Sequence, residues 1–138
     1  MKITIQEYEV YKEQDVLALY ESVGWSNYTN APEMLSQAFH HSLKVLAAFD
    51  QEDLVGIIRV VGDGYSIVFV QDLLVKPAYQ RQGIGRALLD HILAEYAEVY
   101  QLHLLTDDTE KTLSFYRALG FEKVDNIGAS ALTWQRKS

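Results

Sequence analysis

The stretch VKPAYQRQGIGR, residues 75–86, joins a long apolar run to an amphipathic segment. The run Tyr65–Val75 predicts a central strand, and residues 83–99 predict a helix with apolar residues along one face. A strand that leads directly into a helix exposes the unpaired N–H groups of the helix's first turn, where the helix dipole adds partial positive charge. Gly83 and Gly85 lack Cβ atoms, so an anion can come close to the backbone there. The stretch therefore predicts a site for a bound phosphate.

Basic residues gather in this stretch although the chain as a whole is acidic. Lys76, Arg81 and Arg86 lie in it, whereas the chain has 12 Lys and Arg residues against 19 Asp and Glu, a formal net charge of -7. The alternative is that the glycines only tighten the start of the helix and that the arginines are solvated. A dinucleotide-binding motif would need a further small residue where Leu88 stands, and a Walker motif would need Gly-Lys followed by Ser or Thr, so both are excluded.

The pattern along the chain predicts an α/β (α+β) fold with a mixed, mostly antiparallel central sheet flanked by helices. Turn-forming residues at 50–53 and 62–64 indicate hairpins between the strands on either side of them. The expected strands cover residues 2–10, 44–49, 54–61, 65–75, 102–106, 121–124 and 130–135. The expected helices cover 13–23, 32–41 and 83–99, and Asp107 or Asp108 is expected to cap a last helix that ends at Gly120. Because no repeat or linker-like segment is present, residues 1–138 are expected to form a single domain.

Composition excludes several classes of protein. Cys is absent, so the chain has no disulfide, no thiolate metal site and no cysteine nucleophile. No apolar run approaches the roughly 18 residues needed to cross a bilayer, and Ile3 and Ile5 alternate with polar residues where an export signal would be continuously apolar. We therefore expect a cytoplasmic protein with no membrane partner. The acidic balance argues against nucleic acid as a partner and suits a cationic substrate.

Two motifs, in order along the chain, resemble those of one enzyme family. The first is Gln/Arg-x-x-Gly-x-Gly/Ala, whose fixed positions are filled by Gln80, Gly83 and Gly85 after the lead-in Val75-x-Pro77. It resembles the pyrophosphate-binding motif of the GNAT N-acetyltransferase superfamily. The second, FYRALGF at residues 115–121, looks like the Phe-Tyr-x-x-Leu-Gly-Phe signature of that family. The order of the expected elements is similar to that fold over nearly the whole chain.

The resemblance implies an N-acetyltransferase that takes an acetyl group from acetyl-coenzyme A (acetyl-CoA), releases CoA and acetylates a primary amine by direct attack in a ternary complex. The family's backbone amides at 81–86 hold the pyrophosphate. Main chain at 73–75 pairs with the pantetheine arm and the acetyl carbonyl, in a splay between the fourth and fifth strands. The cofactor-binding positions implied here are Leu73, Leu74, Val75, Gln80, Arg81, Gln82, Gly83, Ile84, Gly85, Arg86 and Thr109. Many members have Asn where this chain has Thr109, which leaves a single hydroxyl for that contact.

Tyr116 and Asp72 are the catalytic candidates. The resemblance puts Tyr116 beside the cofactor sulfur, where a phenol of pKa about 10 can protonate a departing thiolate whose thiol has a pKa around 8.5. The alternative for Tyr116 is a tyrosine that only packs in a helix core. Asp72 interrupts an apolar strand, where a carboxylate is costly unless paired, hydrated or functional, so we expect it to act as a base or to bind the amine. Its alternatives are a bulge residue bonded to backbone amides and a water chain as the proton path.

The identity of the acceptor stays open. Trp25 and Tyr28 lie in the loop that forms the acceptor wall in the family, and their rings suit a cation or an aromatic amine, although Trp25 could simply cover the core. Polyamines, aminoglycosides, arylalkylamines, amino acids and protein amino groups all fit, and a homodimer is left open. No His pair has the spacing of a zinc motif, so no metal is expected. The alternative function is a non-catalytic domain that binds CoA or acetyl-CoA as a sensor or partner subunit.

Overall fold

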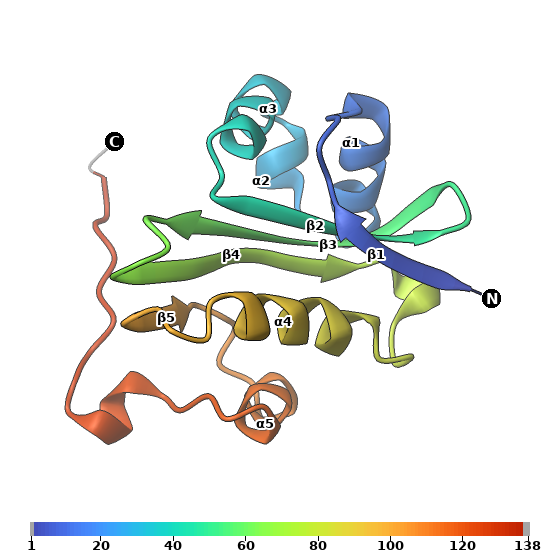
Figure 1. Ribbon diagram of the computed structural model, residues 1–138. Helices are drawn as coiled ribbons and strands as arrows, with labels where there is room; N and C mark the ends of the chain where they lie inside the picture. Colours follow the sequence, from blue (N-terminus) through green and yellow to red (C-terminus); the bar gives the residue numbers. More distant parts are fainter. Residues whose placement is uncertain (1, 137–138) are drawn as a thin grey trace. The chain divides into compact units, whose positions relative to one another are not determined.

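Five strands form one sheet in the order β1-β2-β3-β4-β5, so consecutive strands are neighbours in the sheet (Figure 1). The computed structural model describes residues 2–136. The strands are β1 (Ile3–Glu7), β2 (Lys44–Asp50), β3 (Asp53–Gly62), β4 (Ile67–Val75) and β5 (Gln101–Leu104). The first four pair antiparallel, and β5 runs parallel to β4. The mixed, mostly antiparallel sheet predicted from the sequence is confirmed.

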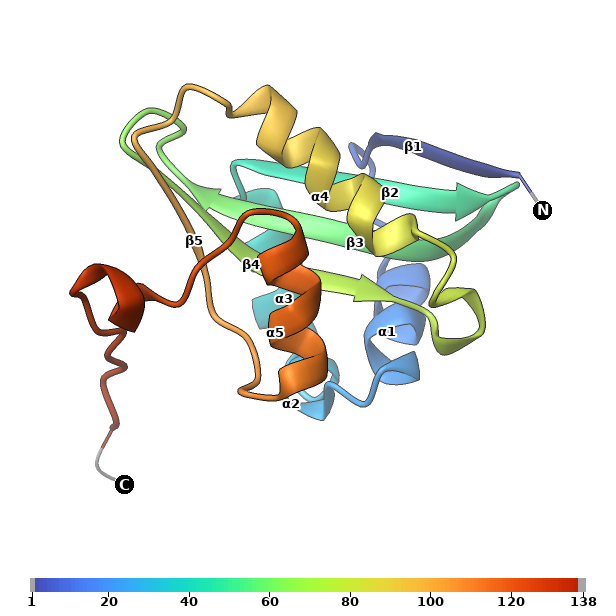
Figure 2. The ribbon, with the colours of Figure 1, turned by 90° about the horizontal axis from the view of Figure 1, so that it is seen from below.

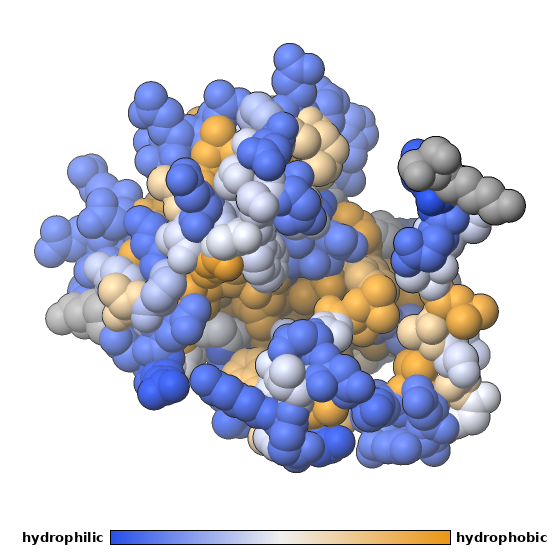
Figure 3. All heavy atoms as spheres, turned by 180° about the vertical axis from the view of Figure 1, so that it is seen from behind, coloured by the Kyte–Doolittle hydropathy of each residue, from blue (hydrophilic) through white to orange (hydrophobic). Residues whose placement is uncertain are grey.

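Helices cover both faces of this sheet. Helices α1 (Glu13–Ser22), α2 (Ser26–Thr29) and α3 (Pro32–His40) lie on one face, and α4 (Ile84–Glu95) lies on the other, as the view from below in Figure 2 shows. The first face buries a core of apolar side chains, each no more than 8% exposed: Val16, Leu19, Tyr20, Leu35, Phe39, Val45, Ala47, Leu54, Ile57 and Leu74. The outer surface of the α1–α3 layer, at the top of Figure 3, carries mostly hydrophilic side chains. These helices are therefore amphipathic, and packing against the sheet holds them in place.

The turn between β3 and β4 is built by Asp63. Its Oδ1 accepts the amides of Tyr65, Ser66 and Ile67 at 2.8, 2.7 and 3.1 Å. Gly62 has a φ of 130°, and a Cβ at that position would lie 2.4 Å from the carbonyl oxygen of Ile67, so the turn requires glycine there. The predicted hairpin is thus confirmed, and it sets the register between the two strands that carry the site.

Residues from Thr106 onward form a second compact unit, separate from the one that contains the sheet. This unit contains α5 (Glu110–Ala118) and a short 3-10 helix, η2 (Val124–Ile127). The helix predicted between residues 107 and 120 is confirmed. The single domain expected over residues 1–138 stays a prediction.

The two terminal strands predicted at 121–124 and 130–135 are wrong, because residues 106–136 contain no strand. A strand exists only when a neighbour completes its hydrogen bonds, and an alternating pattern does not supply that neighbour. Between the two predicted segments the chain instead makes the η2 turn, which ends at Gly128 with a left-handed φ of 85°.

Two kinds of feature are absent from residues 2–136. No helix in this range is long and apolar enough to cross a membrane. No group of three or more His, Asp or Glu side chains in the same range is arranged to hold a metal ion.

Candidate functional site

The loop after β4 ends at a left-handed glycine that starts α4. Gly83 has a φ of 82°, and the first bond of the helix runs from the Ala87 amide to the Gly83 carbonyl at 3.0 Å. The amides of Ile84, Gly85 and Arg86 come before that bond and point out of the helix end. A Cβ at Gly83 would meet no atom within 4 Å, so the space beside these amides is open. The helix start predicted at Gly83 is confirmed, and its geometry fits a bound anion.

Side chains of the same loop hold it against the sheet. Gln80 Nε2 donates to the Val75 carbonyl at 2.9 Å, and Tyr79 Oη donates to Asp50 Oδ2 at 2.6 Å. Gln80, a predicted cofactor residue, therefore uses its side-chain amide to fix the shape of the loop. Arg81 has a φ of 65°, a left-handed conformation that residues other than glycine seldom adopt outside functional or tightly turned segments.

The other polar side chains predicted to lie around the cofactor are exposed and loosely held. Gln82 Nε2 lies 3.4 Å from the Ala78 carbonyl, and Arg86 pairs at 3.8 Å with Asp90, one helical turn away. Contacts of this length on the surface constrain a side chain weakly. Arg86 is therefore free to turn toward an anion at the start of α4.

The strand that leads into this loop has an open edge. Its pairing with β5 runs from Ile67↔Gln101 to Val70↔Leu104, where β5 ends. Beyond that point β4 continues through residues 73–75, paired with β3 on its other side. On the β5 side the described chain offers no strand partner to residues 73–75, so an extended ligand can add there as a further strand. The splay predicted between the fourth and fifth strands is confirmed.

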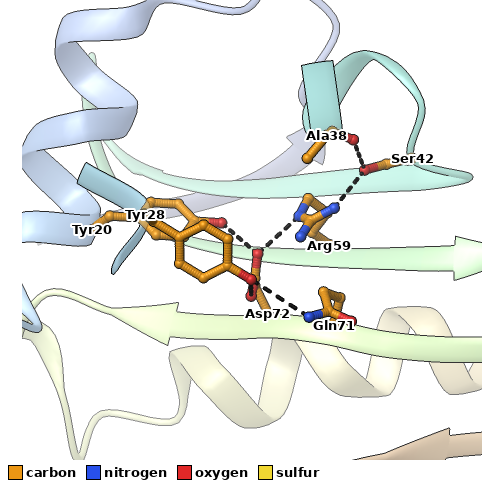
Figure 4. Close-up of polar contacts among 7 residues, drawn as sticks. All are labelled: Tyr20, Tyr28, Ala38, Ser42, Arg59, Gln71 and Asp72. Atoms are coloured by element: carbon orange, nitrogen blue, oxygen red, sulfur yellow. Dashed lines mark hydrogen bonds and ion pairs between the residues drawn. The ribbon is translucent and has the colours of Figure 1, made fainter. Parts of the chain in front are cut away.

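Asp72 lies within the sheet and is 2% exposed. Tyr20 Oη donates to its Oδ2 at 2.8 Å, and Tyr28 Oη donates to its Oδ1 at 2.9 Å (Figure 4). Arg59 Nε donates to Oδ2 at 2.8 Å and balances the negative charge. Burial lowers the pKa of Arg59, but the charge and the hydrogen bond of Asp72, with contributions from Tyr20 and Tyr28, together outweigh burial, so the pKa is raised. The base or amine-binding role predicted for Asp72 stays a prediction, and three protein donors surround its carboxylate.

Three further residues belong to this network and were not predicted from the sequence: Arg59, Tyr20 and Ser42. Arg59 Nη1 donates to Ser42 Oγ at 3.2 Å, and Ser42 Oγ donates to the Ala38 carbonyl at 2.6 Å. One signal was available, because Arg59 is the single charged residue in the apolar run 54–61. Two opposite charges in consecutive apolar strands are stable when buried only if they pair.

A β-bulge brings Gln71 and Asp72 to the same group. Arg59 pairs with Asp72 while Val60 pairs with Val70, which leaves Gln71 as the extra residue of β4. Adjacent residues of a regular strand point to opposite faces. Here Gln71 Nε2 lies 3.5 Å from the Tyr28 Oη that donates to Asp72. The bulge thus turns a polar, exposed side chain toward the α1–α3 layer where the open edge of β4 begins.

Aromatic rings lie on the same side of the sheet. The Tyr20 ring centroid lies 5.9 Å from that of Trp25 and 5.1 Å from that of Tyr28, both edge to face. Tyr20 is fully buried, whereas Trp25 and Tyr28 are partly exposed. Burial raises the pKa of Tyr28, and the charge of Asp72 adds to this, so its hydroxyl stays protonated at neutral pH. The structure therefore brings the two predicted acceptor residues together with Asp72; their binding role stays a prediction.

In the second unit, Tyr116 lies in α5 between two phenylalanine rings. The ring centroids of Phe115 and Phe121 lie 5.0 and 5.6 Å from that of Tyr116, both edge to face. The pKa of Tyr116 is raised, first by burial and then by the charge of Asp107. It therefore remains a protonated phenol at neutral pH, as the predicted acid role requires. That role stays a prediction.

Thr109 caps the start of α5. Its Oγ1 accepts the amide of Thr112 at 3.3 Å and donates to Asp107 Oδ2 at 3.0 Å. Asp107 or Asp108 was expected to be the cap, and that expectation is wrong. Thr109 is the residue just before the helix, and its extended backbone aims the hydroxyl at the first turn. The hydroxyl predicted to contact the cofactor is thus engaged at the helix's own end.

Comparison with known families and structures gives matches over most of the chain. Residues 41–123 match the acetyltransferase (GNAT) domain. A GNAT-family acetyltransferase from Streptococcus pneumoniae TIGR4 is 47% identical, with a TM-score of 0.90 over 99% of this chain and 100% of that chain. The PaiA N-acetyltransferase from Thermoplasma acidophilum, solved in complex with coenzyme A, is 18% identical, with a TM-score of 0.71 over 89% of this chain and 91% of that chain. The second likeness is one of fold.

A curated relative is longer than this chain. Histone acetyltransferase TAP1 from Glycine max is 29% identical over 133 residues. The match covers 87% of this chain and 55% of the soybean protein, so this chain spans about half the length of that relative.

Proposed function

The chain belongs to the GNAT acetyltransferase family, and we propose that it transfers the acetyl group of acetyl-CoA to a primary amine by direct attack in a ternary complex. One observation carries the proposal: the open edge of β4 at residues 73–75 leads directly into the exposed start of α4. A ligand with an extended arm and a pyrophosphate suits both features at once. The relative from Thermoplasma acidophilum was solved with coenzyme A, which supports this cofactor.

The residues at the start of α4 fit the cofactor. Gly83 leaves open space where a side chain would stand, beside amides that precede the first helical bond. We propose that the amides of residues 81–86 hold the pyrophosphate and that Gln80 keeps the loop in shape. The main chain of residues 73–75 would pair with the pantetheine arm. When bound, acetyl-CoA supplies an acetyl group activated as a thioester.

Starting from the ammonium form of the amine, acetyl transfer removes two protons from the nitrogen, one before attack and one as the amide forms, and delivers one proton to the departing thiolate; the second nitrogen proton restores the acid. A lysine-like amine has a pKa of about 10.4 and must lose a proton before it attacks. Asp72 already accepts from three donors, so we propose that water carries this proton to bulk solvent and that Asp72 holds Tyr28 in place. We propose Tyr116 as the acid, because its raised pKa keeps it protonated until the thiolate departs.

The acceptor proposed for this site is a primary amine attached to an apolar or aromatic group. The partly exposed rings of Trp25 and Tyr28, with centroids 6.2 Å apart, support this, because aromatic faces attract both apolar groups and cations. The soybean relative is named as a histone acetyltransferase, so a lysine side chain belongs among the candidates.

Product analysis tests the proposed function. The purified protein is incubated with acetyl-CoA and, in turn, a polyamine, an aminoglycoside, 2-phenylethylamine, a free amino acid and a lysine-containing peptide. Mass spectrometry of each mixture identifies any acetylated amine. We expect protein-dependent acetylation of at least one amine. Binding of acetyl-CoA with no acetylated product would instead indicate the alternative, a non-catalytic CoA-binding sensor or partner domain.

A further inference from the structure

Tyr20 and Tyr28 both donate to Asp72, but they lie at different depths. Tyr20 is fully buried, whereas Tyr28 is partly exposed and its Oη lies 3.5 Å from Nε2 of the exposed Gln71 (Figure 4). That distance is at the outer limit of a hydrogen bond, so Gln71 holds the Tyr28 oxygen weakly. The Tyr28 oxygen is therefore available to a stronger donor that approaches from the surface.

The buried ion pair fixes the direction of the Tyr28 proton. A carboxylate accepts hydrogen bonds and donates none, and Asp72 is paired with the guanidinium of Arg59 at 2.8 Å. Tyr28 Oη, 2.9 Å from Asp72 Oδ1, must then be the donor in that contact. With its proton directed inward, the oxygen of Tyr28 presents its lone pairs to the surface. Because linked hydrogen bonds polarise one another, donation to a carboxylate strengthens that oxygen as an acceptor.

We propose that the Tyr28 oxygen accepts a hydrogen bond from the N–H group of the acceptor amine, and that Asp72 positions it for this by holding its proton. The inference rests on the proposed function, because the amine in question is the one that receives the acetyl group. Asp72 directly precedes residues 73–75, so an amine bound to Tyr28 lies beside the open edge of β4. Tyr28 is then a substrate-binding residue, and Asp72 is a positioning residue that acts through it.

The chemistry of this contact defines the class of ligand. A neutral phenol oxygen accepts from an ammonium and from a free amine alike, so the contact persists after the amine has lost a proton to water. The Trp25 ring, with its centroid 6.2 Å from that of Tyr28, offers an apolar surface beside the Tyr28 ring. The site thus favours amines that carry an N–H group beside an apolar group. It can bind such an amine without an unpaired carboxylate of the protein. A quaternary ammonium, which has no N–H, gains no hydrogen bond from the Tyr28 oxygen and contacts only the ring.

Equilibrium binding tests this inference without turnover. The ligand is 2-phenylethylamine, titrated calorimetrically into the protein saturated with CoA, and the control ligand is its N,N,N-trimethyl derivative. Tyr28→Phe keeps the ring and removes the oxygen. We expect it to raise the Kd of 2-phenylethylamine about tenfold or more, as the loss of a hydrogen bond to a charged group does. The Kd of the trimethyl derivative should not change.

Two further variants test whether amine binding depends on the direction of the Tyr28 proton or on the stability of the fold. Asp72→Asn offers an amide N–H to Tyr28 and turns the Tyr28 proton outward, so it should raise the Kd of 2-phenylethylamine to a similar degree. In a Tyr28→Phe background the oxygen is already absent, so Asp72→Asn should raise the Kd of 2-phenylethylamine no further. Tyr20→Phe removes an equally direct bond to Asp72, so it should lower the free energy of unfolding and leave the Kd unchanged. If Asp72→Asn does not fold, the inference is decided by comparing the Kd of 2-phenylethylamine in Tyr28→Phe with that in Tyr20→Phe.

Several results would overturn the inference. One is an unchanged Kd for 2-phenylethylamine in Tyr28→Phe, and another is equal weakening by Tyr20→Phe. An equal rise in the Kd of the amine and of its trimethyl derivative in Tyr28→Phe would show that the ring environment, and not the hydrogen bond, had changed. Failure of the wild-type protein to bind 2-phenylethylamine would overturn it as well. The proposed function is judged separately, by the acetylated products of the amine panel.

Discussion

Arg59 and Asp72 face each other across β3 and β4, with Arg59 Nε 2.8 Å from Asp72 Oδ2 and both side chains at most 5% exposed. Withdrawing two charges from water is tolerated only when each is paired and its remaining hydrogen bonds are satisfied. Tyr20, Tyr28 and Ser42 supply those further bonds. The pair therefore ties the α1–α3 layer to the strand whose open edge is proposed to hold the thioester.

Removing one member of this pair should destabilise the fold strongly. Arg59→Gln leaves Asp72 buried without its cation, so we expect the free energy of unfolding to fall by about 3–5 kcal/mol. The matched control is Arg86→Gln, at a pair 3.8 Å apart whose side chains are 60% and 54% exposed, where we expect a change of about 0.5 kcal/mol or less. Urea unfolding of both variants measures the difference, and similar losses in the two would contradict this account of the pair.

A negative charge at the start of α4 should weaken coenzyme binding without harming the fold. Asn and Asp adopt left-handed backbone more readily than most residues, and a side chain at Gly83 meets open space, so Gly83→Asn and Gly83→Asp should both fold. Repulsion between the aspartate and the pyrophosphate, about 1–3 kcal/mol, should raise the Kd of CoA about 10- to 100-fold above that of the Asn variant. Calorimetric titration with CoA gives both values. Indistinguishable affinities in the two variants would place the pyrophosphate elsewhere.

The β3–β4 turn should lose its contribution to stability in acid. Hydrogen bonds from the Ser66 hydroxyl and from the amides of Tyr65, Ile67 and Ser66 hold the pKa of Asp63 below its ordinary value of 3.8. A carboxyl whose pKa is depressed by folding stabilises the protein above its unfolded pKa, and this is lost as the pH falls through the folded pKa. Asp63→Asn should therefore be less stable than wild type at neutral pH, with a gap that narrows below about pH 4. Thermal unfolding across this range checks it, and a constant gap would be inconsistent with the assignment.

Loss of the Tyr116 hydroxyl should slow the chemical step. Phe preserves the ring between Phe115 and Phe121, so stability should be unchanged, while loss of a general acid typically lowers the rate roughly 10²–10⁴-fold. Tyr65→Phe, at a side chain 85% exposed in the β3–β4 turn, is the matched control and should behave as wild type. Single-turnover measurement with the amine most readily acetylated in the panel isolates the chemical step. A wild-type rate in Tyr116→Phe would reduce Tyr116 to a packing residue.

The sheet and α4 could be predicted because their signals are local. The turns at 50–53 and 62–64 define a meander of three strands, and Gly83 marks the start of the helix. The strand predicted at 130–135 was wrong, because the sequence pattern of a strand is the same whether or not a neighbouring strand completes its hydrogen bonds. The prediction of the residue that caps α5 was wrong for a related reason. Asp107, Asp108 and Thr109 all have capping side chains, and only the backbone decides which one precedes the first helical residue.

The candidate site was predictable in part. Asp72 stands out in an apolar strand, and this position alone indicated that its carboxylate must be paired or functional. Its partners were not predictable, because Arg59 and Tyr20 belong to β3 and α1 and meet it only through strand register and helix packing. A bulge at Asp72 was one alternative for this position, but its expected backbone partners were wrong, because the carboxylate is held by side chains. The sequence did not show that the bulge makes Gln71 the extra residue and brings Gln71 and Asp72 to the same tyrosine.

Direct transfer of acetyl from the coenzyme to the amine is tested best by initial rates of thiol release, with acetyl-CoA and the amine both varied. The chain contains no Cys, so a thiol reagent detects released CoA and nothing from the protein. Transfer in a ternary complex predicts that release depends on the amine and that double-reciprocal plots intersect. Parallel lines, the pattern of a covalent acyl-enzyme, or release that is independent of the amine would contradict direct transfer.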